Sequence, residues 1–476
     1  MSFNTKENIV FAENPSLSVG TGPIVMDTSS ISEVTYQFQT NTAGVSAGVG
    51  FPVAYNGIET IFDVRIPAGA RVLFDKSYVR MNGIAADMNV GIGTNVPIGV
   101  SIPWNSIAAI LDTAEVQLNQ NATTTEQINQ NLGDGSMVKI LTRYSREMIE
   151  HMSDSFFTPC IESIRDYNNG LLGASAFSPE SLTRRVDQLI DAAGPQPHAK
   201  NLYLSDIFDS LRVPAAFFLQ NLQFKFRPKQ ITDILFTDPG YLLANGFAAS
   251  LPRYFVTNMT LFLTMVNLSE NQLIKERERI MSNESMLRES FSTFDAIQKT
   301  HSQSASYRDS NVKNLQAAVF LFPSRTAADA VGANPYQYCY GSGAGGATGI
   351  SAYQMRYDNV YSPAQPLTVA TVANHNNTDL FFQYKLLTRR SSDREVTLAL
   401  DFVTAMANPR PVPQDHCPYV MFCAQFYPLN AYAHKTMAGA DHEIITAGGA
   451  AEPIIIVRIR SSFLEIRGDT SVYMIN

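Results

Sequence analysis

Charge is the first thing that this sequence has little of. Lys, Arg, Asp and Glu together make up 16% of its 476 residues, whereas about 25% is usual for soluble domains. Hydrophobic residues are at an ordinary 45%, so uncharged polar residues and glycine fill the difference. A surface of this composition favours many polar contacts with neighbouring proteins.

Basic charge is scarcest at the N-terminus. The net charge of the chain is -8, and Lys6 is the only basic residue in positions 1–60. The acidic residues in this segment are Glu7, Glu13, Asp27, Glu33 and Glu59. Proteins that package a genome directly neutralise phosphates with Lys and Arg. We therefore expect no packaging arm and no sequence-specific binding of nucleic acid.

Cysteine and long apolar runs are also scarce. The four cysteines are Cys160, Cys339, Cys417 and Cys423. They are too few for a disulfide-stapled scaffold, so we expect free thiols and synthesis in a reducing compartment. Positions 1–20 lack a basic segment followed by an apolar one, and no run approaches the roughly 18 apolar residues of a membrane span. The sequence predicts a soluble chain made inside the cell without a signal peptide.

A glycine-rich stretch matches the spacing of a nucleotide-binding loop, but its context does not. Gly341, Gly343 and Gly346 satisfy G-x-G-x-x-G, which serves a pyrophosphate only between a strand and a helix. Here a strand-like segment follows at 347–357. We interpret the stretch as a surface loop, and the chain contains no P-loop sequence.

Histidine and cysteine cluster loosely near position 420. The residues that could form a zinc site are His416, Cys417, Cys423, His434 and His442. Five residues separate the two cysteines, whereas zinc motifs usually have two to four. The apolar residues around Cys423 predict a strand with a buried thiol, so we expect no metal.

No catalytic constellation stands out among the remaining polar residues. Glu150 and His151 share a predicted helix with Arg143, Arg146 and Glu147, which we interpret as a solvated face rather than an acid–base pair. The nearest basic cluster, Arg389, Arg390 and Arg394, is typical of a salt-bridge network in a loop. No serine or cysteine lies in a nucleophile elbow. We expect no catalytic residues and no cofactor, and therefore no enzyme.

A charged run in the middle of the chain predicts two domains. The chain exceeds the roughly 250–300 residues at which one hydrophobic core stops growing. Ser269 and Gln272 have the spacing of a capping box at the start of a predicted helix over 269–290. Its apolar stripe would contain Leu273, Ile274, Ile280, Met281 and Leu287. The alternative is a surface helix inserted into one large domain.

Short strand-like segments dominate both sides of this run. In the first half they are 34–38, 61–66, 70–74, 96–102, 114–118, 202–208, 217–226 and 254–266. In the second half they are 315–322, 350–357, 379–386, 395–402, 419–426, 454–459, 462–466 and 471–475. Helical periodicity predicts helices at 104–111, 138–153 and 179–193. Spaced strands with long connections favour an all-β sandwich or jelly roll.

Several segments, in this order, resemble the major capsid proteins of the double jelly-roll lineage, to which adenovirus-type viruses, virophages and polinton-like viruses belong. A short helix and strand precede an aromatic-led helix, a Leu-Asp-Phe segment leads into a strand, a core strand passes into a helix, and a hairpin closes the chain. The segments are 103–119, 144–154, 202–226, 260–280 and 461–476. Positions 1–60 match no known part of that family, and 332–349 is similar to its variable surface loops.

The resemblance implies two tandem eight-stranded jelly rolls with inserted and linking helices. The expected division is an extended arm at 1–60, a first roll at 61–268, a helical linker at 269–310 and a second roll at 311–476. It further implies a homotrimer that forms a pseudo-hexameric capsomer and tiles the icosahedral shell of a DNA virus. The expected partners are further copies of the chain, penton proteins and minor capsid proteins, and the expected location is the virion.

Two other functions are compatible with a β-rich chain. A carbohydrate-binding or carbohydrate-active β-sandwich would present aromatic platforms and clustered carboxylates, but Trp104 is the only tryptophan and the acids are scattered. A viral spike or fibre would show regular repeats, and none are seen. A single jelly-roll capsid protein is disfavoured by the length and by the missing basic arm.

Overall fold

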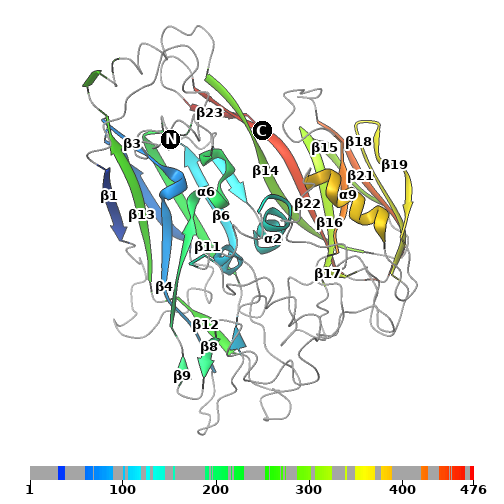
Figure 1. Ribbon diagram of the computed structural model, residues 1–476, viewed down its shortest axis with the longest axis horizontal. Coiled ribbons are helices and arrows are strands. Elements are labelled where there is room, and N and C mark those ends of the chain that lie inside the picture. Colours follow the sequence, from blue (N-terminus) through cyan, green and yellow to red (C-terminus); the bar gives the residue numbers. More distant parts are fainter. Residues whose placement is uncertain are drawn as a thin grey trace, which may run out of the picture.

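Two β units lie side by side in the computed structural model, with helix α2 (Leu132–Arg143) between them (Figure 1). The structure describes residues 31–37, 59–67, 69–88, 100–101, 106–118, 125–128, 132–144, 154–155, 188–191, 194–195, 197–212, 216, 219–229, 252–256, 258–268, 270–271, 274, 287–301, 306–323, 338–339, 349–369, 377–388, 420–426, 439–449, 451, 453–466 and 472–475.

The first unit is a sandwich of two antiparallel sheets, with strand orders β1-β13-β4-β10 and β2-β11-β6-β7. Its strands are β1 (Ile31–Gln37), β2 (Thr60–Arg65), β4 (Tyr78–Met88), β6 (Leu111–Leu118), β7 (Thr125–Ile128), β10 (His198–Tyr203), β11 (Asn221–Pro228) and β13 (Asn258–Asn267). Counted along the chain, strands one, eight, three and six form one sheet, and strands two, seven, four and five form the other. Eight strands in two such sheets make a jelly roll.

The second unit repeats this order. Its sheets contain β14-β22-β16 with β20 beside β16, and β15-β21-β18-β19. The strands are β14 (Leu287–Thr300), β15 (Ser306–Val312), β16 (Leu315–Pro323), β18 (Ile350–Tyr357), β19 (Val360–Thr368), β20 (Phe422–Gln425), β21 (Ala440–Gly448) and β22 (Pro453–Ile466). The chain therefore has the predicted all-β fold of two tandem jelly rolls.

Shorter elements decorate both rolls. The additional strands are β3 (Ala70–Val72), β5 (Val100–Ser101), β8 (Gln188–Asp191), β9 (Gly194–Pro195), β12 (Pro252–Phe255), β17 (Tyr338–Cys339) and β23 (Val472–Ile475). The other helices are the 3-10 turns η3 (Phe74–Lys76), η4 (Ile107–Ile110) and η5 (Asp209–Leu211), and the α-helices α6 (Leu204–Ile207) and α9 (Thr378–Thr388). Strands β5, β8 and β9 form a small sheet of their own.

Alternation of apolar and polar residues builds the first core. Every second residue of β2 is buried, because one face of the strand packs inside the sandwich and the other meets water. On β11 the inward residues are Leu222, Phe224 and Phe226. Phe226 meets Phe62 of β2 edge to face, with ring centroids 6.2 Å apart.

The second core depends on strands that are buried on both faces. All of β16 is buried except its last residue. Its Phe320 stacks on Phe422 of β20 at 4.5 Å and meets Tyr353 of the opposite sheet at 5.5 Å. The opposite face of the sheet packs under helices, with α9 against β20 and α2 against β14 and β22.

Part of the predicted N-terminal arm belongs to a sheet. Residues 31–37 form β1, which pairs along its whole length with β13. The prediction of an extended arm is therefore wrong for these residues, although the strand itself was predicted at 34–38. The rest of 1–58 lies outside the described residues.

The predicted helical linker is also wrong over most of its described part. Glu270, Asn271 and Ile274 are helical, but Ile274 is 49% exposed rather than part of a buried stripe. From Leu287 onward the chain forms β14, and β15 begins within the same predicted linker. The helix prediction fails here because a distant segment makes β14 a strand: β14 pairs with β22 over all 14 of its residues. The limits proposed for the two rolls otherwise stay a prediction.

Three further segments differ from their predicted type. The strand predicted at 379–386 is helix α9, the described end of the helix predicted at 179–193 is strand β8, and the strand predicted at 202–208 turns into α6 after Tyr203. The helix predicted at 104–111 is described as the 3-10 turn η4. The strand predicted at 395–402 lies outside the described residues.

Among the helices in the described residues, none combines the length and the apolar character needed to span a bilayer.

Candidate functional site

The residues considered for zinc do not come together in the described part of the chain. Cys423 is on β20 and His442 is on β21, which belong to different sheets of the second roll. Burial raises the pKa of the Cys423 thiol, and burial lowers the pKa of His442 to about 4. Cys423 is a free, buried thiol, as predicted. His416, Cys417 and His434 lie outside the described residues.

The other sequence candidates are only partly described. Of the predicted charged face, the structure describes Arg143, whereas Arg146 and Glu147 lie outside the described residues. Glu150, His151, Arg389, Arg390, Arg394 and the loop 341–346 lie outside the described residues. Over the residues that are described, no three His, Cys, Asp or Glu side chains are grouped so that they could hold a metal ion.

The side chains that the structure does gather lie at the junction between the two rolls, around α2. This helix follows β7 in the first roll, and Leu132 at its start packs in the first core. Further along, Met137, Val138, Ile140 and Leu141 pack in the second core. The helix is therefore packed against both rolls.

Hydrogen bonds tie the same helix to the second roll. The hydroxyl of Tyr338 donates to Asp134 at 2.9 Å, and the hydroxyl of Tyr384 on α9 donates to the carbonyl of Leu141 at 2.5 Å. Burial raises the pKa of Asp134 to about 6, although Lys229 and the Tyr338 hydroxyl oppose the shift.

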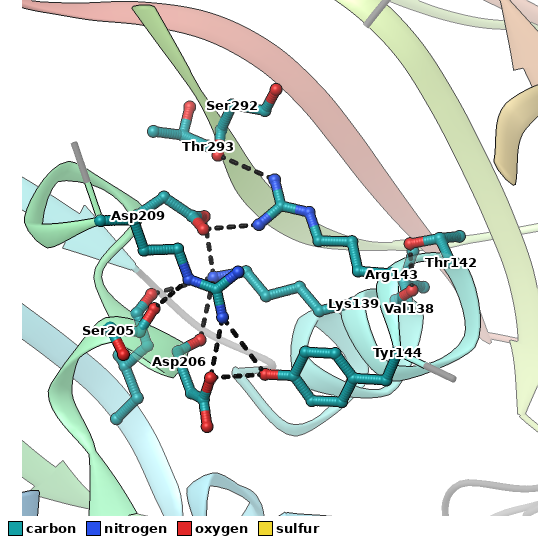
Figure 2. Close-up of polar contacts among 12 residues, drawn as sticks. Val138, Lys139, Thr142, Arg143, Tyr144, Ser205, Asp206, Asp209, Ser292 and Thr293 are labelled. Carbon is teal, nitrogen blue, oxygen red and sulfur yellow. Dashed lines mark hydrogen bonds and ion pairs between the residues drawn. The ribbon is translucent and has the colours of Figure 1, made fainter. Parts of the chain in front are cut away.

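An ion-pair network ties α2 to the first roll (Figure 2). Its centre is Asp209 of η5, whose side chain is 2% exposed. Lys139 lies 2.8 Å and Arg143 lies 2.6 Å from its two carboxylate oxygens. Burial alone would raise the pKa of Asp209, but the charges of Arg143, Lys139 and Arg212 hold it below its usual value. Asp209 is therefore ionised in the fold.

A second acid continues the network toward solvent. Asp206 of α6 accepts a hydrogen bond from the Tyr144 hydroxyl at 2.7 Å and pairs with Arg212 at 2.8 Å. Arg212 also donates to the carbonyl of Ser205 at 2.6 Å. Burial and the charge of Asp206 raise the pKa of Tyr144 well above its usual value, so this tyrosine acts as a neutral donor.

The cations of α2 also reach the second roll. Arg143 donates to the carbonyl of Ser292 on β14 at 3.3 Å. The ring of Phe294, two residues further on, has the Arg143 guanidinium 4.4 Å and the Lys139 ammonium 5.3 Å from its centroid. Contacts between a cation and a ring face at such distances are attractive. Arg143 thus links η5 of the first roll to β14 of the second.

Two long strands join the rolls a second time. β14 and β22 have 14 residues each, about twice the usual strand length. Phe291 and Leu464 on these strands pack in the first core, whereas Phe294 and Ile459 pack in the second. One pair of strands therefore takes part in both cores.

Buried ion pairs and shared strands thus join the two rolls at this junction. The cavity beside α2 is about 20 Å³, lined among others by Lys139, Tyr144 and Ser155, and it has room for about one water. The sequence predicted a helix at 138–153, which overlaps α2. It also predicted that the charged side chains of this helix face solvent. The missed signal is in the segment 202–226, which supplies Asp206 and Asp209 as partners for those cations.

Comparison with solved structures supports the same fold. A chain of the Sputnik virophage, from its 3.5 Å cryo-EM structure, matches with a TM-score of 0.52 and 12% identity over 97% of this chain and 92% of its own. The major capsid protein of mavirus matches with a TM-score of 0.52 and 11% identity, over 93% of this chain and 89% of its own. No protein-family model matches the sequence, and no curated protein sequence matches it. The chain has the double jelly-roll fold and resembles virophage capsid proteins.

Proposed function

We propose that this chain is the major capsid protein of a DNA virus. In this proposal three copies form a pseudo-hexameric capsomer, and capsomers tile an icosahedral shell. The observation that carries the proposal is the pair of jelly rolls held side by side by α2, β14 and β22. Two similar bodies in one subunit, repeated around a threefold axis, give six similar flanks, which is the shape that a hexagonal lattice needs.

The contacts inside the chain support this role. A closed threefold ring is built from identical contacts between copies, so every copy has to hold its two rolls at the same angle. The buried network around Asp209 and the shared strands hold it. The chain then works by shape and contact rather than by catalysis. Its place is the virion, and its partners are its own copies, penton proteins and minor capsid proteins.

The proposal is tested by the mass and outline of the purified full-length chain. Light scattering after size exclusion should give three times the chain mass, and negative-stain images of the same peak should show pseudo-hexagonal particles. A stable monomer at high concentration would contradict the proposal and make sugar-binding assays the next step.

A further inference from the structure

Helices α2 and α9 occupy the same position in the two rolls. Each follows the fifth strand of its roll and precedes the sixth: α2 lies between β7 and β10, and α9 lies between β19 and β20. Their lengths are similar, at 12 and 11 residues. The two helices are therefore structural equivalents, although α2, and not α9, lies between the two rolls (Figure 1).

In the first roll, these elements form the contact with the next roll. α2 packs against β14 and β22, which are the first and eighth strands of the second roll, and β7 also touches β14. As a result the large apolar side chains of α2 are buried on both sides of the helix.

In the second roll, the equivalent elements keep an exposed apolar face. Leu380, Tyr384 and Leu387 of α9 are buried, but Phe382 is 56% exposed and Leu386 is 41% exposed. These two residues are four positions apart and so lie on one face of the helix. Of the six large hydrophobic side chains that the described residues leave exposed, three lie on β19 and α9: Tyr361, Phe382 and Leu386.

We propose that Phe382 and Leu386 dock on the first roll of a second copy of this chain, over β1 and β13. This inference rests on the proposed trimer. Six similar flanks arise in a closed ring when the contact from the second roll to the next copy repeats the contact from the first roll to the second. Strands β1 and β13 are the first and eighth strands of the first roll, as β14 and β22 are of the second. α9 thus does between copies what α2 does within one.

The outward face of the receiving sheet suits an apolar partner. Leu261 and Leu263 of β13 point into the first core, so Phe262 between them points outward. Its ring stacks on Tyr78 of β4 at 5.0 Å, and Tyr78 meets Tyr203 of β10 at 5.7 Å. These half-buried rings form a row that starts on β13 and crosses β4 to β10, so the aromatic surface begins at one of the two receiving strands. Aromatic side chains are enriched where protein surfaces meet.

The first test is the double variant F382S/L386S of the full chain, studied by light scattering over a range of concentrations. Both side chains are exposed within one copy, so thermal unfolding of the monomer should change little. The dissociation constant of the trimer should rise by about 100-fold or more, as expected when buried anchors leave an interface. The matched control is I61S on β2, where Ile61 is 44% exposed and should leave the trimer unchanged.

The outcomes separate the two proposals. A wild-type trimer together with an equally tight F382S/L386S trimer overturns the docking site and leaves the capsomer standing. A wild-type chain that never trimerises overturns both.

A photocrosslinker placed at position 386 tests the location directly. In trimers mixed from ¹⁵N-labelled and unlabelled chains, peptides from 31–37 or 258–267 should be joined to it across two copies. Crosslinks between copies that map instead to β15 or β21 would overturn the assignment.

Discussion

Asp209 is the residue on which the junction depends most, because two cations of α2 converge on its buried carboxylate. We expect Asp209→Asn to lower the free energy of unfolding by about 3 kcal/mol or more, since removing one partner leaves the other charges buried and uncompensated. Urea denaturation followed by circular dichroism measures the change.

The matched control is Asp63→Asn on the exposed face of β2, where the carboxylate only accepts a hydrogen bond from Gln223 at 2.6 Å. It should change stability little, as surface substitutions usually do. Equal effects of the two substitutions would show that the network adds no more than an ordinary surface contact.

Asp134 predicts an unusual dependence of stability on pH. Its pKa is raised from 3.8 to about 6 by burial, so the folded chain holds a proton that the unfolded chain has released. Its contribution to stability is complete below about pH 4 and is lost as the pH rises through about 6. Over that range the wild type should lose up to about 3 kcal/mol relative to Asp134→Asn.

Denaturation of both proteins at pH 4.5, 6 and 7.5 measures this difference. The amide of the variant still offers an oxygen to the Tyr338 hydroxyl, so packing is preserved. A constant difference across these pH values would mean that Asp134 titrates in the folded chain as it does in the unfolded one.

At the scale of elements, α2 contains a glycine that its position does not require. A Cβ added at Gly135 would meet only Ala296, at an ordinary 3.9 Å. Alanine is favoured over glycine inside a helix, so Gly135→Ala should raise the free energy of unfolding by about 0.5–1 kcal/mol. Thermal unfolding measures the gain.

Gly448 on β21 is the contrasting position. Its φ is +79°, and a Cβ there would lie 3.0 Å from the carbonyl oxygen of Gly349. Gly448→Ala should therefore destabilise the fold. If both substitutions destabilise, then α2 is packed more tightly against β14 than these distances indicate.

Elements with a local signal were the ones that the sequence predicted. The alternation in β2 and β6 and the apolar run in β16 gave strands close to those observed. The spacing of Leu380, Tyr384 and Leu387 fits a helix, but the dense apolar composition of 379–386 favoured a strand over α9.

Elements and contacts that depend on distant partners were not predictable in the same way. β14 contains polar residues at both its ends and is a strand because β22 pairs with it. The junction is a similar case, since the charges of α2 look solvated until Asp206 and Asp209, more than 60 positions away, are placed beside them. The resemblance to capsid proteins supplied the double jelly roll, whereas residue patterns alone left a sandwich and a jelly roll open.

At the scale of the whole molecule, the shared strands predict that the two rolls unfold together. Leu464 lies on β22 of the second roll but is fully buried in the first core. Leu464→Ala should cost about 2–5 kcal/mol, the usual range for a buried leucine. Because β22 takes part in both cores, the loss should appear in both rolls.

Hydrogen exchange followed by mass spectrometry measures this roll by roll. Amides of β11 report on the first roll and amides of β16 on the second, and Leu464→Ala should lower their protection by the same free energy. Ile445→Ser, at an exposed position of β21, should lower neither. A loss confined to β11 would mean that the rolls open independently, and it would contradict the coupling that the shared strands predict.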